Sequence, residues 1–194
     1  MEVRFLSGLL LFYLHLPMVF PYMHIDDLLC DFMTKEEDEH MQRIMLMVAA
    51  NLSAQQHLTL ETLIEIGYWK SPRLVPQIKK NEAATVQKLT RLSYHEGDLV
   101  RKTEYLLQLQ GITLPMASAI LMFYNPYQYG IMDTKVWQVL YQLGMVDGKA
   151  SGKSLKTNEF ELYTLLMQNS AKSHQTTLRE VEQGLLKAHA YYFE

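Results

Sequence analysis

The chain has 194 residues, of which 48% are hydrophobic and 20% charged, so it can bury the core of one large domain or of two small helical lobes. Its single cysteine, Cys30, excludes an intramolecular disulfide and a four-cysteine zinc or iron–sulfur site. One cysteine also fits a reducing compartment, so we expect a cytoplasmic protein. None of the seven histidines has the spacing of a metal-binding motif, and no metal site is predicted.

The formal net charge is −3, but the charges are unevenly distributed. Residues 26–39 contain seven acidic residues and one lysine, whereas residues 70–102 contain eight basic and three acidic residues. A basic stretch inside an acidic protein is compatible with nucleic-acid binding. It is equally compatible with a solvated helical face, and the sequence leaves both interpretations open.

Residues 1–32 are predicted to be an apolar and acidic N-terminal extension that precedes a domain over residues 33–194. The apolar run 5–20 contains His15 and Pro17 and is short for a membrane span, which needs about 20 residues. It also lacks the basic start and the small-residue cleavage site of a signal peptide. We expect this run to pack on the domain, with no stable membrane association. Export, membrane insertion and a start at a later methionine remain alternatives.

The elements predicted in chain order are all helical, because no run alternates with the period of a strand. Thr59 and Asp133 are typical helix N-caps, Gly111 and Gly144 are typical helix ends, and Thr177 begins a capping box with a glutamate three residues later. Pro72 and Pro76 interrupt the chain after the second helix. The predicted helices are 36–52, 60–68, 82–92, 99–109, 115–124, one that begins at Asp133 and ends by Gly144, and two that close the chain. This pattern indicates an all-α fold, a compact helical array rather than a simple four-helix bundle.

The stretch 106–144 is the most informative part of the sequence. It predicts a helix, a short hairpin, a second helix, a loop and then an aspartate at the start of a third helix. A hairpin between two helices can point several backbone N–H groups the same way, and these donors suit a phosphate, as does the positive end of the second helix. The glycine at the turn, Gly111, lets a backbone approach closely.

This stretch resembles the helix-hairpin-helix DNA glycosylases, the endonuclease III-like superfamily. Their hairpin reads approximately L-P-G-V-G-x-K-T-A, and a V-D-T-H-V segment follows further along the chain. Here residues 109–117 read LQGITLPMA and residues 132–136 read MDTKV. Weaker similarities lie at 52–55, which matches a family segment that can wedge into DNA, and at 67–71. The resemblance extends over residues 35–190.

The resemblance implies a compact two-lobed helical array with a helix-hairpin-helix motif, acting on double-stranded DNA that carries a damaged or modified base. Asp133 would be the catalytic aspartate, which stabilises positive charge on the sugar as the base leaves and helps to orient water. Residues that would contact DNA are Gly111, Ile112, Thr113, Lys135, Lys70, Arg73 and Gln55. Hydrolysis of an N-glycosidic bond needs no cofactor, so none is expected.

This sequence departs from the family in its hairpin. Bifunctional members carry a lysine that forms a Schiff base with the sugar, and the corresponding position here is Pro115. Lyase activity by that route is therefore not expected, and the resemblance implies a monofunctional enzyme. Thr113 replaces the second hairpin glycine, and Lys135 replaces a histidine, where it can contact phosphate as a point charge. The cysteine-rich iron–sulfur loop of some members is absent.

A flipped base needs aromatic stacking partners. We expect these among Trp69, Tyr124, Tyr127 and Tyr129, with Trp137 also near Asp133 in sequence. Tyrosine and tryptophan are also ordinary residues at the edge of a core, and Trp69, Lys70 and Arg73 have the alternative of a packed indole with exposed cations.

Asp133 likewise has a purely structural interpretation as a helix cap. The favoured hypothesis is a monofunctional DNA N-glycosylase of the repair type, and thus an enzyme. The alternatives are a non-catalytic helix-hairpin-helix DNA-binding protein, which the changed hairpin favours, and a helical protein-interaction domain.

Overall fold

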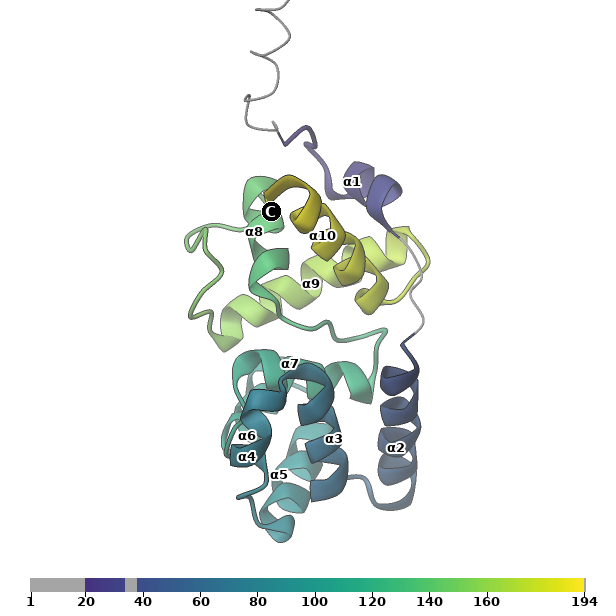
Figure 1. Ribbon diagram of the computed structural model, residues 1–194, viewed down its shortest axis with the longest axis vertical. Helices are drawn as coiled ribbons and strands as arrows, with labels where there is room; N and C mark the ends of the chain where they lie inside the picture. Colours follow the sequence, from purple (N-terminus) through teal and green to yellow (C-terminus); the bar gives the residue numbers. More distant parts are fainter. Residues whose placement is uncertain (1–19, 34–37, 194) are drawn as a thin grey trace, which may run out of the picture.

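The computed structural model describes residues 20–33 and 38–193, and all regular structure in these residues is helical (Figure 1). The prediction of an all-α fold is confirmed. The α-helices are α1 (Ile25–Phe32), α2 (Glu39–Gln55), α3 (Leu60–Lys70), α4 (Val75–Ile78), α5 (Ala83–His95), α6 (Leu99–Leu107), α7 (Leu114–Tyr124), α8 (Thr134–Gln142), α9 (Thr157–Ser173) and α10 (Leu178–Phe193), and one turn of 3-10 helix, η2 (Pro72–Leu74), precedes α4.

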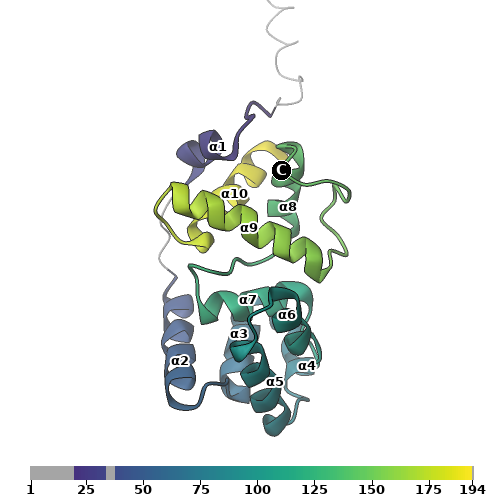
Figure 2. The same ribbon diagram turned by 180° about the vertical axis from the view of Figure 1, so that it is seen from behind.

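The helices form two lobes (Figure 1). One lobe contains α2 to α7, and the other contains α1 together with α8, α9 and α10. After α7 the chain crosses to the second lobe through residues 125–133, which lie between the two lobes (Figure 2). Helix α6 packs against α9, and one continuous hydrophobic core includes residues of both lobes.

Helix α1 belongs to the second lobe although it lies within the region that the sequence assigned to an N-terminal extension. Leu28 and Leu29 are fully buried, and α1 packs against α10 and α9. The approach is close, because a Cβ on Gly184 of α10 would lie 3.0 Å from Leu29 Cδ2. The first described residue, Phe20, packs its ring 5.3 Å from that of Tyr192.

The rest of the predicted apolar run, residues 5–19, lies outside the described residues. In the part of the chain that the structure does describe, no helix has both the length and the apolar character needed to cross a membrane.

Side-chain caps define the starts of α2, α3, α6, α8 and α10. Thr59 accepts a hydrogen bond from the Thr62 N–H at 3.2 Å, as the sequence predicted. The capping box of Thr177 and Glu180 is also confirmed, since each side chain accepts from the other residue's N–H. Gly144 lies at φ +66° just past the end of α8.

Several predicted helix boundaries are wrong. The ends of α3, α5 and α6 lie at Lys70, His95 and Leu107 rather than at 68, 92 and 109. Helix α2 begins at Glu39 rather than at 36, because Asp38 caps it by accepting from the Met41 N–H at 2.8 Å, and it continues to Gln55 instead of ending at 52. Pro72 and Pro76 do not merely interrupt the chain. They occupy the first turns of η2 and α4, where a missing N–H costs nothing.

Candidate active site between the lobes

Asp133 caps α8 and faces a cleft between the lobes. Its Oδ1 accepts the backbone N–H of Lys135 at 2.9 Å, which confirms the predicted capping role. Its Oδ2 lies 3.8 Å from Nζ of Lys70, at the end of α3 in the other lobe. The two carboxylate oxygens therefore have different partners, one within its own helix and one across the cleft.

The cleft beside Asp133 has a volume of about 240 Å³ and is built from three segments. These are the end of α3 with η2, the start of α7, and the residues that enter α8. A neighbouring cavity of about 250 Å³ shares four of the lining residues and reaches the loop before α9. The lining residues of the first are Lys70, Ser71, Arg73, Leu74, Thr113, Pro115, Met116, Met132, Asp133 and Thr134, and those added by the second are Leu114, Gly152, Ser154 and Leu155.

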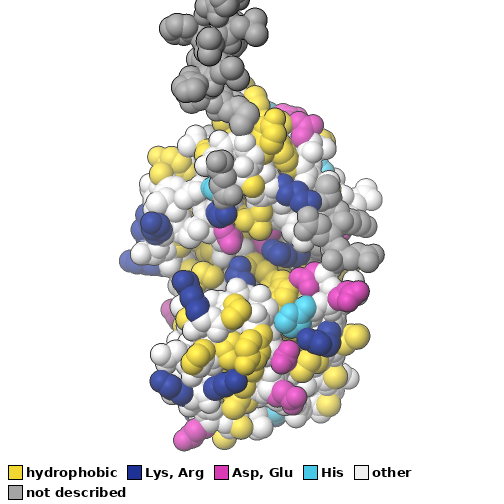
Figure 3. All heavy atoms as spheres, in the orientation of Figure 1, with side chains coloured by type: hydrophobic (Ala, Val, Ile, Leu, Met, Phe, Trp, Pro, Cys, Tyr) yellow, Lys and Arg dark blue, Asp and Glu magenta, His cyan; other side chains and the backbone are white. Residues whose placement is uncertain are grey.

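The cleft is suited to a negatively charged ligand. The N-termini of α7 and α8 both open onto it, and each carries the partial positive charge of a helix start. Lys70 and Arg73 add two cationic side chains to the lining. In the space-filling view, Lys and Arg side chains are present at the waist between the lobes, together with acidic side chains, and others are spread over both lobes (Figure 3).

Lys70 is partly buried, with a side-chain exposure of 21%. Burial lowers the pKa of its ammonium group, and the nearby carboxylates of Asp133 and Glu182 only partly oppose this effect.

A second carboxyl group, Glu182 of α10, lies deeper and is only 1% exposed. It accepts the backbone N–H of Ile131 and lies 3.4 Å from Nη1 of Arg179. Tyr163 of α9 places its hydroxyl 3.3 Å from the same carboxyl group. Burial raises the pKa of Glu182 to about 8, although Arg179, the Ile131 N–H and Lys70 each act to lower it.

The backbone that leads into Asp133 is held from both lobes. The Ile131 N–H donates to Glu182, and the Tyr163 hydroxyl lies 2.9 Å from the Ile131 carbonyl. From the other side, the Met132 N–H donates to Oγ of Ser118 on α7 at 2.9 Å. A Cβ at Gly130 would collide with the Glu182 carboxyl group, so a larger residue here would force that side chain to shift. These contacts fix the position from which Asp133 faces the cleft.

The hairpin contributes to the cleft mainly through its second half. Thr113 and Pro115 are exposed and line the cleft. Gly111, at φ +78°, faces α4 instead, where a Cβ would lie 2.9 Å from the Ile78 nitrogen. Ile112 is 7% exposed and belongs to the core. The structure therefore does not place Gly111 or Ile112 on the cleft wall.

Of the predicted base-pocket aromatics, Trp69 lies next to the cleft residue Lys70. Its Nε1 donates to Oδ2 of Asp38 at 2.7 Å, and the Arg179 guanidinium lies 5.5 Å from its ring centroid. Its ring also meets that of Phe123 at 5.1 Å. Trp69 thus joins α2, α3, α7 and α10 at the place where the two lobes meet.

The three tyrosines do not line the cleft. Tyr124 donates its hydroxyl to the Thr90 carbonyl at 3.3 Å inside the first lobe. Tyr129 lies beneath the ammonium group of Lys102, which is 5.8 Å from the ring centroid. Tyr127 is 70% exposed in the loop after α7.

The predicted DNA-contact residues outside the hairpin are dispersed. Arg73 lines the cleft and is exposed, and Lys135 is exposed in the first turn of α8. Gln55 lies in the last turn of α2, at the end of the first lobe that points away from the second lobe, and its carbonyl accepts from Arg91 (Figure 1).

The sequence did not single out Glu182, Arg179, Tyr163 or Ser118. On α10, Arg179 and Glu182 have the three-residue spacing of an ordinary surface ion pair. Only their burial against residues 130–133 distinguishes them, and that contact joins segments about fifty residues apart.

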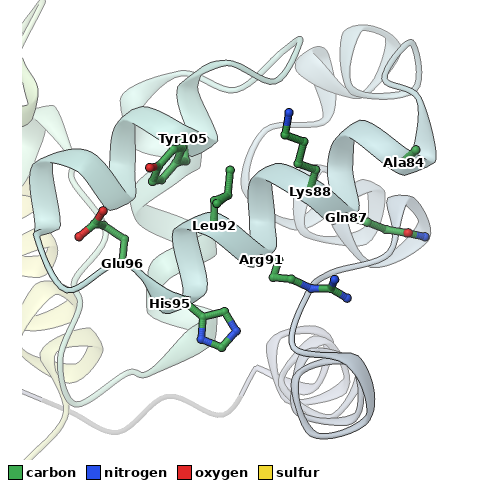
Figure 4. Close-up of a pocket in the computed structure, with 8 residues that line it drawn as sticks. All are labelled: Ala84, Gln87, Lys88, Arg91, Leu92, His95, Glu96 and Tyr105. Carbon is green, nitrogen blue, oxygen red and sulfur yellow. The ribbon is translucent and has the colours of Figure 1, made fainter.

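A larger hollow, of about 610 Å³, lies along the outer side of α5 in the first lobe (Figure 4). Side chains from one face of α5, including Lys88, Arg91 and His95, line it together with Glu96 and Tyr105. It contains neither Asp133 nor the buried polar groups around it. Size alone does not identify a site, and the convergent charged groups favour the cleft at Asp133.

Within residues 20–33 and 38–193, no three His, Cys, Asp or Glu side chains are grouped so that they could hold a metal ion. The chain matches no family model, no curated protein and no solved structure.

Proposed function

We propose that this chain is a DNA N-glycosylase that removes a damaged or modified base from double-stranded DNA by hydrolysis of the N-glycosidic bond. The observation that carries the proposal is the position of Asp133. It stands at a helix start with one oxygen 3.8 Å from Nζ of Lys70, in a cleft between two helical lobes that Lys70 and Arg73 also line. The resemblance of residues 109–117 and 132–136 to the glycosylase hairpin and aspartate segments is the second support.

Binding would begin with the backbone of the DNA. Two helix N-termini together with Lys70 and Arg73 suit phosphate oxygens, and such contacts position a duplex without reading its sequence. The target nucleotide would then rotate out of the stack into the space between the lobes. The half-buried indole of Trp69 adjoins Lys70 in the chain, but it packs against Phe123 and Arg179 and is not among the residues that line the cleft.

Asp133 would act on the sugar. As the base leaves, positive charge develops on the sugar ring. A nearby carboxylate stabilises that charge most effectively when it is already held in position and does not have to move during the reaction. The three hydrogen bonds that hold Ile131 and Met132 supply this rigidity. Because Pro115 offers no nucleophile at the hairpin position, water completes the cleavage and leaves an abasic site.

The direct test is base release from a panel of duplex oligonucleotides that carry deaminated, oxidised or alkylated bases, with alkali to cut the resulting abasic sites. Asp133→Asn keeps a capping oxygen for the Lys135 N–H, so we expect it to change the free energy of unfolding by less than about 1 kcal/mol. It should lose most base release while retaining DNA binding.

Asp98→Asn is the matched control. Asp98 caps α6 in the same way, with Oδ1 accepting from the Arg101 N–H at 2.8 Å, but it lies outside the cleft. It should retain full base release. Equal release by wild type and Asp133→Asn would remove Asp133 from the mechanism.

The non-catalytic alternative has one specific observation in its favour. Gly111 packs against α4 and is not available at the cleft, which weakens the parallel with a catalytic hairpin. Absence of release from every substrate, together with tight binding to abasic-site duplexes, would replace the glycosylase proposal with that of a binding protein.

A further inference from the structure

The hollow along α5 combines two cations with an apolar lining. Lys88 and Arg91 are exposed and project from successive turns of α5 (Figure 4). Leu92, which is 40% exposed, and the half-buried Tyr105 of α6 supply apolar surface. Arg91 is already held in place, because its Nη2 donates to the Gln55 carbonyl at 3.1 Å. A guanidinium that is fixed beforehand loses less side-chain entropy when it binds a carboxylate.

The charge of this hollow favours an acidic occupant. Glu96, just past the end of α5, is the one carboxylate among its lining residues, and it only partly offsets the charges of Lys88 and Arg91. The exposed Leu92 between these charges favours an occupant that also has an apolar side chain.

The exposed face of α1 has the complementary character. Asp27, Cys30 and Asp31 are exposed and have the three- and four-residue spacing of neighbours on one side of a helix. Residues so spaced lie about 5–6 Å apart, so the two aspartates match the separation of Lys88 and Arg91. Met23, just before α1, is 82% exposed and offers an apolar side chain beside the aspartates.

The α1 face and the hollow cannot meet within one molecule. Helix α1 packs against α10 and α9 in the second lobe, whereas α5 belongs to the first lobe and packs against α6. The two helices lie at opposite ends of the molecule in both ribbon views (Figures 1 and 2). Only another copy of the chain can therefore bring an α1 face to the hollow.

We infer that the hollow along α5 binds the acidic face of α1 from a second copy of this chain, so that copies associate head to tail. The contact joins two different surfaces, and each added copy leaves one of each free for the next. One short helix in one hollow forms a small interface, so the association is weak, and its exposed ion pairs make it sensitive to salt. The cleft at Asp133 takes no part in this contact, so the inference does not depend on the proposed function.

The first measurement is sedimentation velocity of the full chain over a range of protein concentrations. At about 50 mM salt, we expect the mean sedimentation coefficient of the wild type to rise with concentration. At about 500 mM salt it should stay constant, because the Debye length is then below about 5 Å. A wild type that remains monomeric at low salt at every concentration would overturn the inference.

Two double variants disable one surface each. Lys88→Glu with Arg91→Glu reverses the charge of the hollow, and Asp27→Asn with Asp31→Asn neutralises the α1 face while it keeps an acceptor for the Tyr22 hydroxyl. Each double variant alone should sediment as a monomer at low salt. An equimolar mixture should form a one-to-one dimer and nothing larger, because it contains one intact hollow and one intact α1 face. No dimer in the mixture would contradict head-to-tail association.

Controls distinguish this contact from general changes of charge. Arg43→Glu changes an arginine on α2 whose side chain is 66% exposed, and Glu161→Gln changes an exposed residue of α9, and both should associate like the wild type. Circular dichroism and thermal unfolding verify that every variant is folded.

Oxidative crosslinking tests which surfaces meet. Cys30 lies between Asp27 and Asp31, and Gln87 lines the hollow. With copper–phenanthroline and oxygen as the oxidant, Gln87→Cys should give a ladder of disulfide-linked copies that maps to residues 30 and 87. Glu161→Cys has the same number of cysteines and should not give a ladder.

The competing occupant of a cationic hollow is DNA. Loss of duplex binding by Lys88→Glu with Arg91→Glu, with sedimentation unchanged from that of the wild type, would assign the hollow to DNA and overturn the inference.

Discussion

The buried carboxyl group of Glu182 accepts a hydrogen bond from the backbone N–H of Ile131, and this contact joins α10 to the segment that ends at Asp133. Tyr163 and Ser118 hold the same segment by the Ile131 carbonyl and the Met132 N–H. The candidate catalytic carboxylate is therefore positioned by three side chains from α7, α9 and α10. Four predictions examine this arrangement and the cleft beside it.

The stability of the protein should depend on pH through Glu182. Burial raises its folded-state pKa to about 8, from an ordinary value of 4.5, so folding favours the protonated form. The contribution of protonated Glu182 to the free energy of unfolding is complete below about pH 4.5, and it is lost as the pH rises to about 8. Urea unfolding at a series of pH values should show a decline in the free energy of unfolding over this window.

Glu182→Gln should abolish the part of the decline in the free energy of unfolding that Glu182 causes, because an amide does not ionise. Glu161→Gln, at an exposed position of α9, is the control and should retain the wild-type slope. An identical slope for Glu182→Gln and wild type would mean that Glu182 does not titrate in this window.

Ser118→Ala should destabilise the protein by about 1–3 kcal/mol, because the Met132 N–H would lose its acceptor in a buried site. Amide hydrogen exchange at Met132 should become faster in the same variant. Ser173→Ala, which removes an exposed hydroxyl from the end of α9, should change the stability by less than about 0.5 kcal/mol. Unchanged exchange at Met132 in Ser118→Ala would show that this hydrogen bond does not hold the segment.

Gly111→Ala and Gly144→Ala should differ in cost, although both residues have positive φ. Gly144 has open space around it, so alanine there should cost about 1–2 kcal/mol from backbone strain alone. At Gly111 the added Cβ would also lie 2.9 Å from the Ile78 nitrogen, which adds about 1–3 kcal/mol of overpacking. Equal losses of unfolding free energy would contradict the close packing of the hairpin on α4.

Arg73→Gln should weaken DNA binding. It should also reduce by about 1 the magnitude of the slope of the logarithm of the DNA association constant against the logarithm of the salt concentration, the amount expected when one phosphate contact is lost. Arg73 is exposed on the cleft wall, so its removal should leave the fold intact. Arg43→Gln changes a 66% exposed arginine on α2 and serves as the control. Equal salt slopes for Arg73→Gln and wild type would exclude Arg73 from the DNA interface.

Local interactions explain why most of the helices could be predicted. Thr59, Asp133 and Thr177 each bond to an N–H two or three residues further along the chain, so the sequence near each helix start contains the whole interaction. Helix α1 was missed because eight residues with two adjacent aspartates and no side-chain cap resemble an acidic extension. Its burial against α10 stabilises it.

The candidate site could be predicted only in part. The resemblance of residues 109–117 and 132–136 to the glycosylase segments indicated which carboxylate to examine, and the same resemblance implied that Lys70 contacts DNA. Tyr124, Tyr127 and Tyr129 were grouped with Asp133 because they precede it in sequence, but none of the three lines the cleft. Nearness in sequence does not predict nearness in space once a chain crosses between lobes.

By itself, the sequence determined the all-α class and the capped starts of α3, α8 and α10, because these depend on composition, periodicity and bonds within one helical turn. Asp133 was selected through the resemblance to the glycosylases. Only the tertiary structure decided that Lys70 lies opposite Asp133 and that Glu182 is buried beneath Ile131. Those contacts join residues far apart in the chain, and they form only when the two lobes pack together and exclude water from the groups between them.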